Sequence, residues 1–145
     1  MQKKASFLVA VLDQIRDRLN AGEHGLAAAF TRQFWSRVAV DDLSDRSAED
    51  AAGMTIACFR HFQRRAWDAV HIDVENPEYE RDGWSSDHTI VQIAHPNMQF
   101  ITDSILMELS RHGLVTHHLQ NMVFAAVRDT SGVLLRIDPT SPDAR

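Results

Sequence analysis

The sequence predicts an α+β fold, in which an N-terminal layer of helices precedes an antiparallel sheet with one helix packed on its face. Two patterns predict this class. As far as about residue 65, apolar side chains recur every third or fourth position, which is the period of an amphipathic helix. From residue 70 onwards, short runs alternate apolar and polar side chains between turn residues, which is the period of a half-buried strand. At 145 residues the chain suits one compact domain or a small domain with a helical extension.

The first half of the chain is expected to form three helices. An apolar stripe marks the first over residues 8–19, and Gly22 suits its end because glycine tolerates the left-handed backbone. A second stripe runs over residues 23–38. The third helix is expected over residues 47–65, where the Ser47 hydroxyl can accept a hydrogen bond from the backbone amide near Asp50.

The second half is expected to follow the order β-β-α-β-β. Alternation predicts strands over residues 70–75 and 88–94, and apolar residues spaced by four predict a helix over 97–112. A long extended stretch follows over 114–128, a hairpin turn over 129–132, and an antiparallel return over 133–137. The segment 139–145 is expected to be a flexible tail or linker.

Charge, cysteine content and the N-terminus restrict the class of protein further. Lysine and arginine number 15 against 20 aspartate and glutamate, so the net charge is −5, which disfavours nucleic acid or an anionic membrane as a partner. The single cysteine, Cys58, excludes an internal disulfide and fits a reducing compartment. The apolar run 7–12 is shorter than a secretory signal or a membrane span, which need about 7–15 and about 20 residues. We therefore expect a cytoplasmic protein.

Side chains with catalytic or metal-binding potential are scattered along the sequence. It contains no glycine-rich phosphate loop and no nucleophile elbow, and both lysines lie at positions 3 and 4. Regular strands would point the histidines apart, and the i, i+4 pair Glu108 and His112 is expected to be a solvated contact. Cys58 is expected to be a small buried thiol, and Trp84 to fill the edge of the core. We therefore predict no catalytic site, no metal site and no bound cofactor.

Three blocks of the second half resemble one known family. They are Asn76-Pro77 followed by Gly83-Trp84-x-Ser86-x-His88-Thr89-Ile90-Val91, the block Phe100-x-x-Asp103-Ser104-x-x-Met107-Glu108-Leu109-x-Arg111-x-Gly113-Leu114-x-x-His117, and the hairpin Arg128-Asp129-x-x-Gly132. On these blocks the chain resembles the N-terminal region of the large bacterial NAD-specific glutamate dehydrogenases, over about residues 34–134. It departs from the family at Gln99, where proline is usual, and at Asn121-Met122, where His-Pro is expected.

The resemblance implies a fold and a parent activity. It implies an ACT-like (ferredoxin-like) sheet over residues 67–138, after a helical segment over 1–66. We expect this sheet to be incomplete, with the second helix and the last strand of the unit missing or replaced. The parent enzymes oxidise L-glutamate to 2-oxoglutarate and ammonia with NAD, through residues that lie far downstream of this region. The chain is therefore expected to be a non-catalytic regulatory or oligomerisation domain. Its expected partners are neighbouring domains or subunits, including further copies of itself.

The alternative is a sensor module that binds an amino-acid effector. Its candidate binding residues are His95, Asn97, Gln99 and Asp103, between the second strand and the following helix. Glycine in that loop would let backbone amides approach a carboxylate, and residues 94–99 contain none, which favours the structural role. An open sheet edge and an uncovered apolar face over 114–127 are expected to drive self-association.

Overall fold

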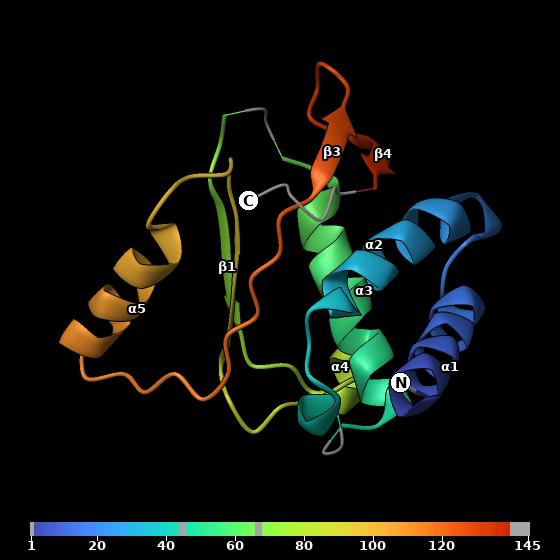
Figure 1. The fold of residues 1–145 in the computed structure, drawn as a ribbon, viewed down its shortest axis with the longest axis horizontal. Helices are drawn as coiled ribbons and strands as arrows, with labels where there is room; N and C mark the ends of the chain where they lie inside the picture. The colour runs from blue at the N-terminus through green and yellow to red at the C-terminus, as the bar shows by residue number, and fades with distance from the viewer. Residues whose placement is uncertain (1, 44–45, 66–67, 140–145) are drawn as a thin grey trace.

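The computed structural model describes residues 2–43, 46–65 and 68–139, and it confirms the α+β class (Figure 1). The N-terminal layer consists of α1 (Gln2–Arg18), α2 (His24–Ser36) and α3 (Ala48–Gln63), with the 3-10 turns η1 (Ala21–Glu23) and η2 (Val40–Leu43) between them. The second half contains β1 (His71–Glu75), α4 (Tyr79–Asp82), β2 (Ile90–Ala94), α5 (Ile101–Arg111), β3 (Ala125–Arg128) and β4 (Leu134–Asp138). The predicted boundary at residues 66 and 67, and the predicted tail from residue 140 onwards, lie outside the described residues.

The first three helices pack around a core of aliphatic and aromatic side chains. Ile15 of α1, Phe30 of α2 and Phe59 of α3 are 3%, 2% and 1% exposed. Trp35 donates its indole N–H to Thr55 Oγ1 at 2.9 Å, so the polar atom of this buried ring has a partner. Removal of these apolar surfaces from water is the main source of stability in a domain of this size.

The start of α3 forms as predicted. Ser47 Oγ accepts a hydrogen bond from the Asp50 amide at 3.1 Å, and this satisfies one of the amides that a helix leaves unpaired at its N-terminus. The buried side of α3 begins with Ala51, Ala52 and Gly53. Because these residues are small, α1 and the segment around Trp84 can lie close to the helix axis.

The strands of the described residues form two separate two-stranded antiparallel sheets, where a single sheet was expected. β1 pairs with β2 in a register that places His71 opposite Ala94, and β2 faces α3. β3 pairs with β4, and β4 lies against α2, where Gln33 donates to the carbonyl of Asp138 at 3.0 Å. The helical layer therefore contacts both sheets on different sides.

The extended stretch predicted over 114–128 forms a strand only at its end, in β3. Strand N–H and C=O groups need a neighbouring strand, and the five residues of β4 can pair with a short β3 alone. Residues 114–124 instead run as an irregular connection. Gln120 ties it to the carbonyl of Phe34 at 2.7 Å, and Asn121 ties it to Thr102 Oγ1 of α5 at 3.1 Å.

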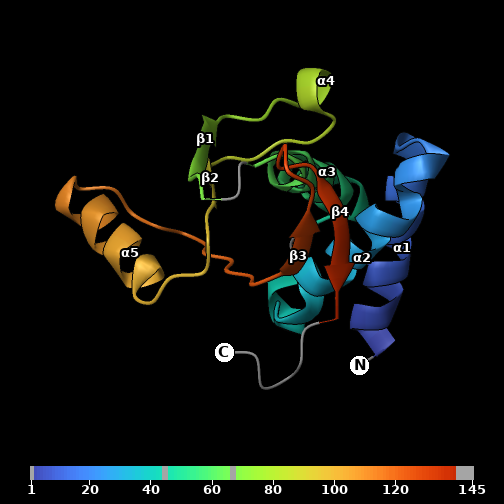
Figure 2. The ribbon, with the colours of Figure 1, turned by 90° about the horizontal axis from the view of Figure 1, so that it is seen from above.

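Helix α5 lies at one end of the molecule, with the β1–β2 sheet between it and the helical layer (Figures 1 and 2). No residue of α5 is buried. Its apolar stripe of Ile101, Ile105 and Leu109 is half-buried, and α5 makes no extensive contact with either sheet of the described residues.

Candidate functional site

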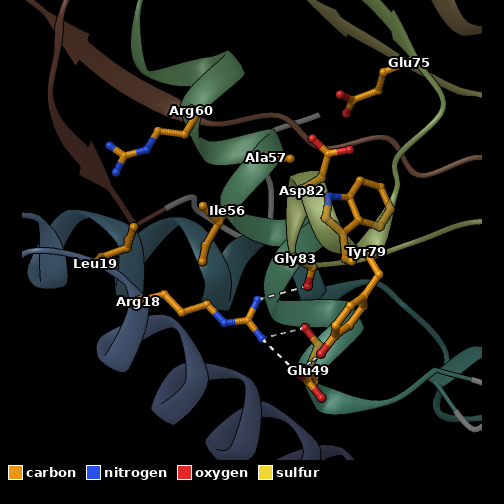
Figure 3. A pocket seen from close by; sticks show the side chains of 12 residues that line it. Arg18, Leu19, Glu49, Ile56, Ala57, Arg60, Glu75, Tyr79, Asp82 and Gly83 are labelled. Atoms are coloured by element: carbon orange, nitrogen blue, oxygen red, sulfur yellow. Dashed lines mark hydrogen bonds and ion pairs between the residues drawn. The ribbon is translucent and has the colours of Figure 1, made fainter.

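A groove of about 450 Å³ lies between the C-terminal end of α1, one side of α3 and the α4 turn (Figure 3). Apolar groups from Leu19, Gly53, Ile56 and Trp84 contribute to its lining. The charged residues that line it are Arg18, Glu49, Arg60, Glu75 and Asp82. The partners of these charges decide what the groove can do.

The α4 turn positions one side of the groove because a glycine reverses the chain there. Gly83 has a φ of +75°, a left-handed conformation that favours glycine, and its amide donates to the Tyr79 carbonyl at 2.9 Å. Trp84 follows directly and is 1% exposed, in close contact with Gly53 of α3. The prediction that Trp84 is buried in the core is confirmed.

Arg18 joins the three elements around the groove. Its guanidinium donates to the Gly83 carbonyl at 3.5 Å and to the Glu49 carbonyl at 3.3 Å, and it lies 4.0 Å from the Glu49 carboxylate (Figure 3). The Tyr79 hydroxyl donates to the same carboxylate, and this hydrogen bond raises the pKa of Tyr79. α1, α3 and α4 are thus connected by one polar cluster.

The other charges of the groove have partners as well. Arg60 forms an ion pair with Glu23 of η1, and this hydrogen-bonded contact lowers the pKa of Glu23. Asp82 accepts from Arg81 and from the Glu78 amide, which lower the pKa of its carboxyl. Arg18, Glu49, Arg60 and Asp82 are therefore engaged in ion pairs and Glu75 accepts from the Gln92 side chain, as expected of a structural cluster at the surface.

Groups suited to covalent or metal chemistry do not gather in the described part of the chain. Burial raises the pKa of the Cys58 thiol to about 12, so the thiol is protonated at neutral pH and a poor nucleophile. Within residues 2–43, 46–65 and 68–139, no group of three or more His, Cys, Asp or Glu is placed to hold a metal ion. No helix of those residues is both long and apolar enough to cross a membrane.

The four candidate effector residues lie between β2 and the first turn of α5. His95 is half-buried, and its Nδ1 lies 2.6 Å from the carbonyl of Pro96. Asn97, Gln99 and Asp103 are exposed. Within the described residues no hydrogen bond or ion pair joins any two of the four, so a shared site at this loop stays a prediction.

The motif around Gly83–Thr89 holds the β1–β2 connection together. Ser86 Oγ accepts from the His88 amide at 3.1 Å, and Thr89 Oγ1 donates to Asn76 Oδ1 at 2.7 Å. The His88 ring stacks on His117 with centroids 4.1 Å apart. The spacing argument missed this stack because it compared histidines within single elements, although both histidines belong to the blocks that resemble the family.

The R-D-x-x-G hairpin has an equally structural explanation. The Arg128 guanidinium donates to the carbonyls of Phe62 at 2.7 Å and Gln63 at 3.4 Å, which are unpaired at the end of α3, and it lies over the Phe62 ring. Asp129 Oδ1 accepts from the Ser131 hydroxyl at 2.7 Å and from the amides of Val133 and Ser131, and these hydrogen bonds lower the pKa of Asp129.

The fold and these contacts define an α+β domain built on a helical layer, in which the motif residues fasten one element to the next. The family model described as "Glutamate dehydrogenase, ACT1 domain" matches residues 30–145. The chain therefore belongs to the family of glutamate dehydrogenase ACT1 domains.

Two curated relatives agree with this assignment. The NAD-specific glutamate dehydrogenase of Pseudomonas aeruginosa is 39% identical over 110 residues, which cover 76% of this chain and 7% of that protein. The NAD-specific glutamate dehydrogenase of Halomonas elongata is 30% identical over an alignment of 148 positions, gaps included, which covers 99% of this chain and 9% of that protein. The chain thus spans less than a tenth of the length of these relatives. No solved structure matches it.

Proposed function

We propose that this chain is the non-catalytic N-terminal regulatory and oligomerisation domain of an NAD-dependent glutamate dehydrogenase, and that it holds neighbouring domains or subunits together. Both relatives are named NAD-specific glutamate dehydrogenase, which supports an enzyme of this kind as the parent protein. The proposed parent converts L-glutamate and NAD to 2-oxoglutarate, ammonia and NADH. A helical segment 1–66, an ACT-like segment 67–138 and a tail 139–145 are the proposed parts. NAD binds to the parent's other domains, the protein is cytoplasmic, and neither nucleic acid nor a membrane is its partner.

One observation carries this proposal: the β1–β2 sheet exposes an apolar face. Ile72 pairs with Ile93 and Val74 pairs with Val91, and directly opposed residues of an antiparallel pair lie on the same face of a sheet. Ile72, Val74 and Val91 are 59%, 61% and 45% exposed. Contiguous apolar side chains of this kind mark a surface that another protein surface covers.

On the opposite face of the same sheet, the β2 side is already covered. Gln92 and Ala94 are buried, and their strand lies against α3. Since the aligned segment spans only 7% and 9% of the two relatives, more than nine-tenths of each relative lies outside it. The remaining domains of the parent are therefore the partner that we propose for the open face.

A charge placed on the open face tests this proposal. In the full-length enzyme, Val74→Asp is expected to release the domain, seen as faster limited proteolysis between this domain and the remainder and as a changed assembly mass. In the 145-residue chain alone the same variant is expected to unfold at the wild-type temperature, because Val74 is already exposed there.

Val9→Asp is the matched control, since Val9 is 56% exposed on α1, away from the sheet. The proposal is wrong if the full-length Val74→Asp enzyme is digested and assembles like the wild type.

A second measurement addresses catalysis. The isolated chain is expected to form no NADH from L-glutamate and NAD, and to give no heat on titration with NAD. Protein-dependent NADH formation by the purified chain would assign a catalytic role to it instead.

An amino-acid sensor is the second candidate. Its support is that Asn97, Gln99 and Asp103 are exposed and have no hydrogen-bond partner among the described residues, so they are available to a ligand. Calorimetric titration with a panel of amino acids tests this role, with Asp103→Asn as the variant. Heat that is present for the wild type and lost for the variant would favour the sensor.

A further inference from the structure

Helix α5 has two different faces. Ile101, Ile105 and Leu109 form the half-buried face. On the opposite side, Met107 is 73% exposed at the centre of the helix. Helix α5 lies at one end of the molecule (Figure 2), so a second protein can reach this exposed side chain.

The residues around Met107 are arranged symmetrically. At 100° per residue, Asp103, Ser104, Ser110 and Arg111 lie within about 60° of Met107 on the helix surface, and all four are exposed. The negative residue is four positions before Met107, and the positive one is four positions after it. Each of the two serines is three positions from Met107, and small side chains let two helices approach closely.

An antiparallel copy of the same helix complements this arrangement. If a two-fold axis passes beside Met107, Asp103 of one copy lies at the same height as Arg111 of the other, and the two methionines meet. The symmetry forms two such pairs of opposite charge. Phe100, 75% exposed, and Leu114, 59% exposed, lie just outside the two ends of α5 and add apolar surface next to the contact.

We propose that this outer face of α5 binds the same face of α5 in a second copy of the chain, antiparallel and centred on Met107. The inference deepens the oligomerisation role proposed above and names the surface that carries it. Asp103 has no ion-pair partner among the described residues. Arg111 binds Glu108 through Nε at 3.1 Å and Nη2 at 2.7 Å, which leaves its Nη1 for an acceptor on the other copy.

The backbone before α5 supports an interface at this end. Phe100 has a φ of +62°, an unfavourable conformation for a bulky residue, and it holds an aromatic ring at the surface. A helix of 11 residues is about 16 Å long, so the contact is smaller than the roughly 1,200–2,000 Å² of a standard interface. We therefore expect weak association of the isolated chain, strengthened in the parent by its other contacts.

Charge reversal tests the register directly. Sedimentation of the full 145-residue chain, at concentrations from about 10 μM to 1 mM, is expected to show a monomer–dimer equilibrium. Asp103→Arg alone and Arg111→Asp alone each place like charges opposite one another twice, so each is expected to weaken association by about tenfold or more. An equimolar mixture of the two variants forms only opposite-charge pairs across the contact, and it is expected to associate as the wild type does.

Two controls separate this effect from misfolding. Asp17→Arg changes an exposed carboxylate on α1 and is expected to leave association unchanged. Circular dichroism of each variant confirms the helix content.

A third variant tests the centre of the contact. Met107→Glu is expected to abolish the dimer because it buries two carboxylates at the axis.

Three results would overturn the proposal: a monomer at the highest concentration, association that neither single variant weakens, or variants that fail to recover when mixed. These outcomes are independent of the Val74→Asp experiment, because Val74 lies on the β1–β2 sheet and not on α5. The Val74→Asp experiment can thus refute the proposed docking on the parent without refuting the α5 pair. Equally, the charge-reversal experiment can refute the α5 pair without refuting the docking.

Discussion

Gly53 of α3 should not tolerate a methyl group, although glycine is a poor residue for a helix. A Cβ built at Gly53 would lie 2.6 Å from Trp84 Cβ, 2.9 Å from Trp84 Cγ and 3.0 Å from the Gly83 carbonyl oxygen. The nearest of these atoms is attached to the backbone, so no change of rotamer moves it away. Gly53→Ala therefore forces α3 and the segment at Trp84 apart.

The two opposing contributions can be weighed. Replacing glycine by alanine inside a helix stabilises a protein by about 1 kcal/mol when the methyl group has room. Overpacking a tight core costs about 1–3 kcal/mol. At a separation of 2.6 Å the overpacking term wins, and we expect Gly53→Ala to lower the free energy of unfolding by up to about 2 kcal/mol.

Gly25 of α2 provides the matched control, because a Cβ there meets nothing within 4 Å. Gly25→Ala is expected to raise the free energy of unfolding by about 0.5–1 kcal/mol. Urea unfolding followed by circular dichroism measures both variants. The packing argument would be refuted if Gly53→Ala matched or exceeded the wild type in stability while Gly25→Ala behaved as expected.

Three further variants test other parts of the fold. Trp84→Ala is expected to lower the free energy of unfolding by about 3–5 kcal/mol in urea, since it removes a buried ring. Arg128→Ala leaves two carbonyls at the end of α3 unpaired and is expected to cost about 1–3 kcal/mol, seen as a lower melting temperature. Burial lowers the pKa of His61, so the unfolded chain binds a proton at this residue more readily than the folded chain does. The contribution of neutral His61 to the free energy of unfolding is therefore present above about pH 6.5 and is lost as the pH falls below that value. The difference in stability between pH 7.5 and pH 5.5 is therefore expected to shrink in His61→Asn, and an unchanged difference would contradict this origin.

Features that depend on neighbouring residues could be predicted from the sequence. The predicted Ser47 cap is confirmed. It could be predicted because a capping serine and the amide it binds are only three residues apart. The hairpin near Asp129 is also confirmed, and it could be predicted because its turn joins two consecutive strands. Burial of Trp84 agrees with its predicted place at the edge of the core, close before the strand predicted over residues 88–94.

Features that join distant residues could not be predicted in the same way. Periodicity indicates which side of an element is apolar, but it does not say which other element covers that side. The sheet therefore appears as two separate pairs, and the stack of His88 on His117 joins segments that were considered separately. The groove depends on Arg18, Glu49 and Tyr79, which come from three elements and share no local motif.

The distribution of apolar side chains separates the folded core from the two surfaces proposed to bind partners. Leu134 and Ile137 of β4 belong to the same buried cluster as Phe30 and Phe59, so the C-terminal hairpin completes the core of the helical layer. The β1–β2 sheet contributes one face to α3, and α5 contributes no buried residue. The core is thus complete without the open face of the sheet or the outer face of α5. A charged substitution on either surface is therefore expected to leave the core intact, which is why the proposed experiments can separate binding from folding.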